Sequence, residues 1–467
     1  QVLLRAMSCP RRVQVVARHV TASPVQGVAL DVVEPPASFA TDPIGFLCEQ
    51  RKVHPDAFLL RRSAKNQYVI VNDPQMVETV LSDESSFGDP VTENMSVNRL
   101  VFGVDKDLLA QHESRVVKKL RGFLIKSKDE LATRIANEMK TYLAGRIGDG
   151  GVMDLRDLGE AIFWPMTKAL FGDHSVEQVE PRLYKAWEVI DGQLGKALKG
   201  HKIPEVQESV TLAAENFSQS IKGASGCPMG PALAFYNAEV GTANGGDDEA
   251  AARMAAGAWW GGLGNTWPST VWSFGMILAD PKYKRMAYEE VDRSFADQPD
   301  SEGNYDVGRL SFFTAALNEV LRLKTYSIAW RTVRKDTTVA SESGRTYSLA
   351  KGTLLAVPWA VQHYDEELWS EPHTFRPERH MPGQEELKGK KLSAVRERFA
   401  LSPFSWGAHK CSGYPLAMVE IPVALAVVFQ MYDMELLDPL PGQDMKSAFG
   451  VVGPDTQPTR VKFTRRK

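Results

Sequence analysis

A cysteine near the C-terminus is the residue of this chain best placed to do chemistry. Cys411 stands in the stretch FSWGAHKCSGYPLAMVE, residues 404–420, and apolar residues then repeat at helical spacing from 416 to 428. A helix therefore begins at or just after the cysteine. Free backbone N–H groups and the dipole at a helix N-terminus stabilise an anionic sulfur. Cys411 is a candidate metal ligand or nucleophile.

The surroundings of Cys411 favour the metal. A cysteine nucleophile needs a histidine base within hydrogen-bond reach and an open, polar site. His409 is only two residues away along a turn, so it is poorly placed to act as that base. Gly407 and Gly413 let the turn approach something flat. A single thiolate presented to a planar cofactor suits heme iron. A buried cysteine that begins an ordinary helix is the alternative without chemistry.

An uncharged segment is expected to lie across from such a cofactor. Residues 254–279 contain no charged side chain, which is long enough for a membrane span. We expect a buried helix instead, because glycines, Asn265 and Pro268 concentrate in its middle. Pro268 cannot donate to the carbonyl of Gly264, so the helix should bend there and leave an oxygen free beside Asn265. A kinked core helix without chemistry is the alternative.

A charged pair follows this segment in the chain. Glu319 and Arg322 share a helix face at i and i+3 and can form a charge-assisted pair. Most such pairs are solvated and weak. This pair stands after the uncharged segment and ahead of both the stretch FRPERH, residues 375–380, and the cysteine turn.

In this order the motifs resemble the cytochrome P-450 superfamily, whose heme-binding loop has the pattern Phe-x-x-Gly-x-x-x-Cys-x-Gly. The resemblance implies a mostly α fold with a small β subdomain. It implies heme b, iron protoporphyrin IX, with Cys411 as the axial ligand and a loop shaped by Phe404, Gly407 and Gly413. It also implies a structural triad under the heme, made by Glu319, Arg322 and Arg379. His380 stands where an aromatic residue often follows the last arginine.

The same resemblance implies cations for the two heme propionates. Arg331 and His409 occupy positions that superfamily members use for this purpose. Arg115 aligns with the arginine of a Trp-x-x-x-Arg pattern whose tryptophan is Gln111 here, and Lys118 or Lys119 could serve in its place.

The stretch WGGLGNTWPSTVW, residues 260–272, is similar to the central helix of one branch, which contains cholesterol 7α-hydroxylase, sterol 12α-hydroxylase and prostacyclin synthase. Typical monooxygenases carry an acid and then an alcohol at the bend, to relay protons for dioxygen cleavage. Here Gly264 holds the acid position and Asn265 the alcohol position, and Thr266 follows. Gly264 cannot relay a proton, whereas Asn265 can donate a hydrogen bond and orient water.

We therefore expect a heme-thiolate monooxygenase that hydroxylates a hydrophobic, sterol-like or terpenoid lipid with O2 and electrons from an NADPH-dependent reductase. The first alternative is a reductase-independent isomerase or dehydratase of lipid hydroperoxides or endoperoxides, which needs no proton relay. The second is a non-catalytic heme protein that senses or carries a ligand.

Composition sets limits on the partners. Lys and Arg number 55 against 58 Asp and Glu, a net charge of −3, so no basic excess indicates nucleic-acid binding. Four cysteines without a CxxC pair fit free thiols in a reducing compartment. We expect a monomer.

The first 34 residues form a basic segment ahead of a catalytic domain at 35–467. Five basic residues precede the first acid, Asp31, which is typical of a targeting presequence or of a segment on an anionic membrane; a solvated arm is the alternative. We expect the cytosolic face of the endoplasmic reticulum membrane, with an anchor that could precede Gln1.

Local patterns predict the remaining elements. Apolar runs on either side of residues 61–67 predict a hairpin, and Asn72-Asp73 predicts the cap of a helix that ends near Leu81. Residues 108–295 are expected to be mostly helical, and short strands are expected at 332–339 and 354–358.

Overall fold

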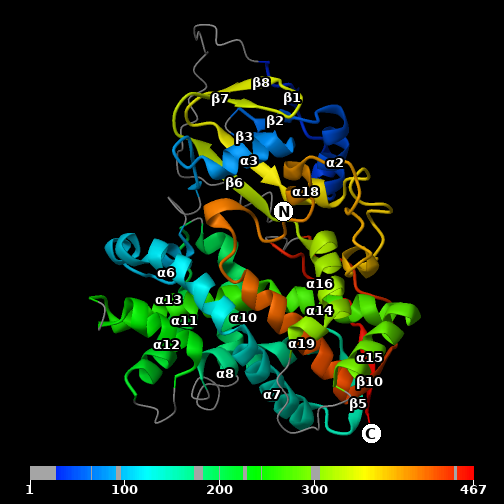
Figure 1. Ribbon diagram of the computed structural model, residues 1–467. Coiled ribbons are helices and arrows are strands. Elements are labelled where there is room, and N and C mark those ends of the chain that lie inside the picture. Colours follow the sequence, from blue (N-terminus) through cyan, green and yellow to red (C-terminus); the bar gives the residue numbers. More distant parts are fainter. Residues whose placement is uncertain are drawn as a thin grey trace.

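The larger sheet and the main body of helices occupy opposite ends of the computed structural model (Figure 1). The structure describes residues 28–466 except 65, 91–95, 173–181, 199, 224–228, 243–244, 296–305 and 446–449. Most of the basic N-terminal segment therefore lies outside the described residues, as do Cys9 and Cys227. The predicted mostly α fold with a small β part is confirmed.

The larger sheet has six strands in the order β1-β2-β3-β9-β6-β4. Their bounds are β1 (Val32–Val33), β2 (Ala57–Ser63), β3 (Asn66–Val71), β9 (Leu354–Pro358), β6 (Ile328–Val333) and β4 (Phe87–Gly88). β2 and β3 form the predicted antiparallel hairpin, with Leu59 opposite Val69. β6 runs antiparallel to β9 and pairs on its other side with β4. The strand predicted near 332–339 is two strands, β6 and β7.

Two smaller sheets complete the β structure. One is antiparallel in the order β10-β11-β5, with β10 (Tyr432–Leu436), β11 (Arg460–Arg465) and β5 (Gly150–Asp154). The other is the hairpin of β7 (Thr337–Ala340) and β8 (Thr346–Leu349).

The helices divide between the two ends. Beside the large sheet lie α2 (Pro43–Val53), α3 (Pro74–Ser82), α17 (Trp359–His363) and α18 (Ala394–Phe399). The helical end contains α5 (Val97–Leu100), α6 (Lys106–Lys126), α7 (Lys128–Arg146), α8 (Asp157–Phe171), α10 (Arg182–Ala197), α11 (Pro204–Ile221), α12 (Pro231–Val240), α13 (Asp248–Gly264), α14 (Thr266–Ala279), α15 (Pro281–Phe295), α16 (Ser311–Lys324) and α19 (Tyr414–Met431). Short 3-10 turns are η1 (Ala37–Ala40), η3 (Val307–Arg309), η4 (Pro377–His380) and η5 (Gly407–His409). As predicted, α3 is capped by Asp73, whose carboxylate accepts the N–H of Met76.

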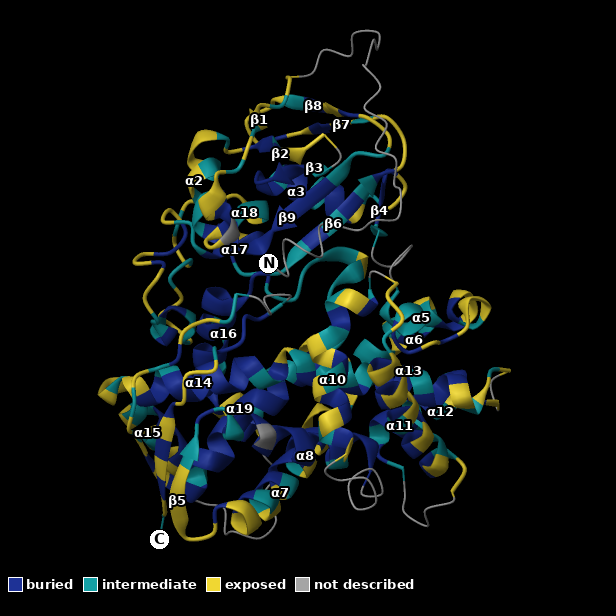
Figure 2. Cartoon of the chain, turned by 180° about the vertical axis from the view of Figure 1, so that it is seen from behind, coloured by how far each residue is buried: buried dark blue, intermediate teal, exposed yellow. Residues whose placement is uncertain are grey.

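α14, α16 and α19 form the centre of the helical end, where buried residues dominate (Figure 2). Phe274 of α14 and Phe429 of α19 stack with their ring centroids 6.1 Å apart. A helix that is apolar on all sides is either a core helix or a membrane span. Among the described residues, Gly407–Met431 is the one stretch long and apolar enough for a span, and most of it is buried inside the protein.

The uncharged segment is broken where the sequence predicts. α13 ends at Gly264, α14 begins at Thr266, and Asn265 lies between them. Pro268 occupies the first turn of α14, where its missing N–H costs little. The carbonyl of Asn265 accepts the backbone N–H of Ser269 at 3.2 Å and its hydroxyl at 2.7 Å. We call residues 264–266 the helix break.

Candidate active site

Cys411 lies three residues before the first residue of α19, with Gly413 as the cap. Its N–H donates to the carbonyl of Phe404 at 2.9 Å, which closes the turn. Burial is the largest influence on the thiol and raises its pKa, while the N–H groups of Gly413 and Tyr414 lower it. The expectation that the local environment favours thiolate is thus wrong for the protein alone. Desolvation outweighs the helix terminus, so the thiolate form needs a cation beside the sulfur.

Gly407 and Gly413 of the cysteine turn differ in whether their surroundings require glycine. Gly407 has a φ of +75°, and a Cβ there would lie 2.7 Å from the carbonyl oxygen of Leu81 in α3. Glycine at 407 is therefore required by the close approach of α3. A Cβ at Gly413 would meet the sulfur of Cys411 at 3.7 Å, an ordinary contact. The ring of Phe404 packs edge-on against Tyr414.

Cys411 is solvent-accessible and yet strongly desolvated. Its residue is exposed, while burial raises the pKa of its thiol. Asp191 of α10 combines the same two properties, because it is exposed and burial raises its pKa to about 6. Accessible surface together with desolvation is expected of a group that borders an internal recess rather than the outer surface.

The fold brings two of the predicted propionate cations together. Arg331 Nη1 lies 3.7 Å and His409 Nδ1 lies 3.1 Å from the same Oδ2 atom of Asp89. Within the described part of the chain, Arg331 Nη2 is buried and makes no hydrogen bond. A buried guanidinium with an unused donor calls for an anion. The thiol of Cys411 and this pair of cations therefore fit a heme with its two propionates.

Arg115 lies elsewhere. Its Nη2 donates to the carbonyl oxygen of Glu239 at 2.7 Å and lies 2.8 Å from Nδ1 of His112. Lys119 also binds the Glu239 carboxylate, at 2.9 Å. Arg115 and Lys119 thus connect α6 to α12, and the structure does not bring Arg115 to the pair at Asp89.

At the helix break, Asn265 is exposed and fastens a C-terminal loop. Its Oδ1 accepts the N–H of Val451 at 2.9 Å. A Cβ at Gly450 would lie only 2.2 Å from this oxygen, so the contact requires glycine at that position. The oxygen of the amide is therefore in use, and its N–H groups remain to donate.

Thr266 faces away from this loop, toward α19. Its hydroxyl oxygen lies 2.6 Å from the carbonyl oxygen of Gly262 and 2.6 Å from Oε1 of Glu420. A hydroxyl has one proton, and a carbonyl can only accept, so Thr266 donates to Gly262. The same hydroxyl also donates toward Oε1 of Glu420, so its proton is shared between the two acceptors. Burial raises the pKa of Glu420 to about 8, even though the contact with Thr266 lowers it.

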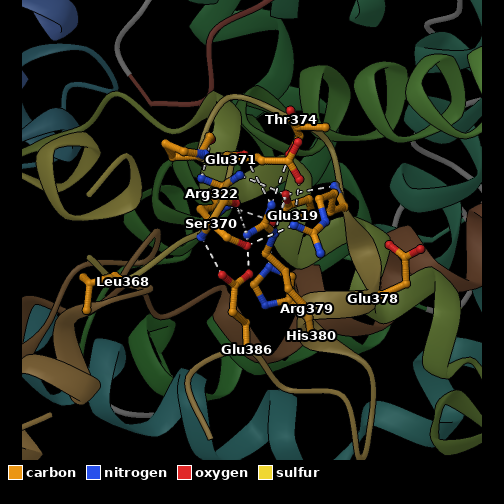
Figure 3. A network of polar contacts seen from close by, with 12 residues as sticks. Glu319, Arg322, Leu368, Ser370, Glu371, Thr374, Glu378, Arg379, His380 and Glu386 are labelled. Atoms are coloured by element: carbon orange, nitrogen blue, oxygen red, sulfur yellow. Dashed lines mark hydrogen bonds and ion pairs between the residues drawn. The ribbon is translucent and has the colours of Figure 1, made fainter. Parts of the chain in front are cut away.

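A second polar centre is built around Glu319 (Figure 3). Arg322 binds both carboxylate oxygens at 2.9 Å, and Arg379 Nε lies 3.0 Å from Oε1. His380 Nε2 lies 2.8 Å from Oε2, and the N–H of Arg376 donates to Oε1 at 3.0 Å. We call Glu319, Arg322, Arg379 and His380 the ion network. The structure brings together the three residues that the resemblance groups, and His380 joins them.

Most polar atoms of the ion network have further partners. Arg322 Nη1 also donates to the carbonyls of His363 and Pro372 at 2.6 and 2.7 Å, and Arg379 also pairs with Glu386. Burial raises the pKa of Glu319, but hydrogen bonds from Arg322 and His380 outweigh it and hold the pKa at about 2. The carboxylate is therefore ionised throughout the physiological range.

Sequence reasoning missed Asp89, Asp191 and His363 and gave Glu420 no role. Burial lowers the pKa of His363 to about 3, so this histidine is neutral, and its Nε2 accepts the N–H of Ser402 at 3.1 Å. Glu420 alone carried a signal, as a carboxyl inside an otherwise apolar helix. Asp89, Asp191 and His363 come to their partners from distant parts of the chain.

Comparisons with known proteins agree with this geometry. The family model of cytochrome P450 matches residues 173–463, more than half of the chain. The chain belongs to the cytochrome P450 family, which implies a heme-thiolate cofactor.

Its relatives include sterol hydroxylases. Cholesterol 7-alpha-monooxygenase of Cricetulus griseus is 28% identical over 202 residues, 41% of this chain and 40% of that protein. 25-hydroxycholesterol 7-alpha-hydroxylase of Rattus norvegicus is 29% identical over 215 residues, 43% of this chain and 50% of that protein. Demethylepipodophyllotoxin synthase of Sinopodophyllum hexandrum is 29% identical over 210 residues, 44% and 37% of the two chains. The matched regions thus span half or less of these relatives. Within the family the chain resembles the branch of the sterol 7α-hydroxylases.

Proposed function

We propose that this protein is a heme-thiolate monooxygenase that hydroxylates a hydrophobic sterol-like or terpenoid lipid with O2 and reductase-supplied electrons. The observation that carries the proposal is Cys411, an accessible but desolvated thiol at the N-terminus of a buried helix. Such a thiol is suited to an iron cation and poorly suited to act as a free nucleophile.

The chain's own residues divide the work of holding heme b. Cys411 would bind the iron, and Arg331 and His409 would bind propionates in competition with Asp89. Phe404 and Gly413 fix the cysteine turn, while Glu319, Arg322 and Arg379 hold the segment between α16 and that turn. Arg115 would reach a propionate only by leaving Glu239. When bound, the heme supplies dioxygen activation at its iron.

The helix break would form the side of the site that meets dioxygen and substrate. Asn265 offers amide N–H groups to a ligand or a water molecule, since its oxygen is taken by Val451. Thr266 shapes the break through Gly262 and Glu420, and Gly264 leaves room beside it. The sterol-like substrate rests on the relatives, two of which act on cholesterol or 25-hydroxycholesterol according to their names.

The missing side chain at Gly264 favours a second candidate function, which needs no proton relay. The uncharged segment supplies no acid of its own at the break, and a rearrangement of a lipid hydroperoxide or endoperoxide needs none. The second candidate is therefore a reductase-independent isomerase or dehydratase in which Asn265 donates to the peroxide oxygen.

The partners and location follow from the same proposal. We place the catalytic domain at 35–467, with the basic segment 1–34 directed to the cytosolic face of the endoplasmic reticulum membrane. A reductase that draws on NADPH would dock near the cysteine turn, where Lys118 is a candidate contact for an acidic surface. Arg121, a second candidate, donates to the Lys410 carbonyl at 2.8 Å. The protein would act as a monomer.

Optical spectra test the proposal first. Reduced protein under carbon monoxide should give the red-shifted Soret band of a thiolate-ligated heme, and Cys411→Ala should abolish it. Folded, heme-loaded protein without this band would sink the assignment. Purified protein with a reductase and NADPH is then offered cholesterol and 25-hydroxycholesterol, and separately a fatty-acid hydroperoxide without reductant. Hydroxysterol formation supports the monooxygenase, whereas rapid isomerisation of the hydroperoxide supports the second candidate.

A further inference from the structure

On the side that faces α10, the helix break has no titratable group of its own. Residues 254–279 contain no acid, base, cysteine or tyrosine. Hydroxylation, on which this inference rests, consumes one O2, two electrons from the reductase and two protons, and gives one hydroxylated product and one water. The protons must reach dioxygen through groups that gain and lose them. A carboxyl from another helix is therefore needed at this side.

Asp191 of α10 lies at that position. Its Oδ1 accepts the indole N–H of Trp260 at 3.2 Å, one turn before Gly264 on α13. A Cβ at Gly264 would lie 3.5 Å from the same Oδ1, and no other atom of a distant residue would lie within 4 Å. The carboxyl thus lies within ordinary contact distance of the point where a side chain at Gly264 would begin.

The packing around Trp260 keeps Asp191 in place. Trp187, one turn before Asp191 on α10, donates its indole N–H to the carbonyl of Trp260 at 3.5 Å. The Trp260 ring also lies 6.3 Å from the ring of Phe102, which is fully buried. Trp187 therefore holds the backbone of Trp260, and Phe102 packs near the indole that binds the carboxyl.

The chemistry of Asp191 differs from that of Glu420, the other carboxyl near the break. Glu420 is fully buried and accepts the hydroxyl of Thr266, so it has no contact with solvent from which to recover a proton. Asp191 is exposed, and burial raises its pKa to about 6, against a smaller lowering by Trp260. It can exchange protons with water at neutral pH.

We propose that Asp191 is the carboxyl that supplies protons to the helix break, in place of a side chain at Gly264. Asp191 gives up a proton on the side that faces Gly264 and recovers one from solvent, so that the carboxyl is unchanged after each turnover. Without it, dioxygen would take its two protons from water that no residue positions. Its O–O bond would then stay intact, and the two electrons and two protons would leave as hydrogen peroxide instead of forming water and hydroxylated product.

The test compares Asp191→Asn with Glu188→Gln in the full-length, heme-loaded protein. Glu188 is exposed one turn earlier on α10 and pairs with Lys185, so it serves as the matched control. The partition of consumed oxygen between hydrogen peroxide and water is measured with reductase and NADPH, with and without cholesterol or 25-hydroxycholesterol. Asp191→Asn should lower the coupled fraction about tenfold or more and change the solvent isotope effect, while Glu188→Gln should leave both unchanged.

Binding spectra separate this role from substrate recognition. The Soret shift on sterol addition gives a dissociation constant, which should stay within about twofold of wild type in Asp191→Asn. An unchanged oxygen partition would overturn the proposal. So would a loss confined to sterol affinity, which would make Asp191 a specificity residue. The reduced carbon monoxide spectrum shows whether each variant still holds its heme.

Moving the carboxyl gives a stricter test. The double variant Asp191→Asn with Gly264→Asp places the acid on α13, where the Cβ has room. Recovery of at least part of the coupling lost in Asp191→Asn supports proton supply, and a double variant that folds and binds sterol but stays uncoupled contradicts it. The partition measured without sterol does not depend on the substrate, so it stands even if sterol hydroxylation fails. A wild-type protein that consumes no oxygen with reductase would refute the proposed function and this role together.

Discussion

The ion network and the helix break both bury carboxyl groups, but they treat them in opposite ways. Glu319 receives five contacts from three side chains and a backbone N–H, and its pKa falls to about 2. Glu420 touches one hydroxyl, and its pKa rises to about 8. Its Oε2 has no hydrogen-bond partner within the described residues.

The difference indicates what each region is built for. A network with many partners has one low-energy arrangement, so it holds backbone segments in place. A region with unused donors and protonated acids keeps groups that a ligand or a proton can engage. The first region is rigid support, and the second is where we expect chemistry.

Glu319→Gln should give the largest effect, because it removes the fully buried charge that Arg322 and Arg379 share. Breaking a buried network of this kind costs about 3–5 kcal/mol. Thermal unfolding and the fraction of protein that holds heme measure the loss. Glu371→Gln, which removes an exposed partner of Arg376, should cost under about 0.5 kcal/mol. Equal effects of the two substitutions would contradict a support role.

Glu420→Gln should act in the opposite direction at high pH. Glu420 titrates near 4.5 when unfolded and at about 8 when folded, so its ionisation destabilises wild-type protein as pH rises from 4.5 to 8. The limit of this effect is on the order of 5 kcal/mol. Glutamine can accept the hydroxyl of Thr266 and cannot ionise. Unfolding at several pH values should therefore find the variant gaining on wild type toward pH 8, and a pH-independent difference would mean that Glu420 is already ionised.

Two substitutions separate the two roles of the Asn265 amide, the oxygen that accepts and the N–H groups that donate. Asn265→Ala leaves the Val451 N–H without its acceptor and should cost about 1–2 kcal/mol as well as the coupling of oxygen consumption to product. Asn265→Asp keeps the acceptor and loses the amide donors. Unfolding should therefore be close to wild type in Asn265→Asp, while its peroxide release rises. Identical behaviour of both variants would show that the amide donors have no part of their own.

Asp89→Asn should have the smallest effect, and on heme retention rather than on folding. Neutralising Asp89 removes a competitor for Arg331 and His409, which is worth about 1 kcal/mol for a partly exposed pair. Heme transfer to an apo-globin acceptor should slow about fivefold. Glu84→Gln, whose acid lies 3.6 Å from His409 but is mostly exposed, should change the rate little. Faster transfer from Asp89→Asn would mean that Asp89 helps to hold the site together.

The sequence predicted the features that are local in the chain. The hairpin of β2 and β3, the Asp73 cap and the break at Asn265 depend on neighbouring residues, and all three are confirmed. The family is confirmed as well, because its motifs are short and their order is kept. The site residues themselves remain predictions, although the fold brings Glu319, Arg322 and Arg379 together.

Features that depend on distant partners could not be predicted. Helical spacing places Cys411 at a helix N-terminus but does not say how deeply the thiol is buried, and burial reverses the expected pKa shift. The pattern at Arg115 does not reveal that Glu239, on α12, takes its guanidinium. Nothing in the sequence of α10 predicts that its Asp191 will lie next to Gly264 of α13.

The C-terminal loop has a consequence for the order in which the protein can be made. Val451 donates to Asn265, the carbonyl of Val452 accepts the indole N–H of Trp272, and the N–H of Val452 donates to the carbonyl of Lys324. A ribosome must therefore synthesise more than nine-tenths of the chain before the helix break has its full set of contacts. Until then the nascent protein holds its uncharged segment, residues 254–279, without this loop. A chaperone that shields apolar surface should therefore associate with truncated chains that stop before residue 450 and release those that continue past it.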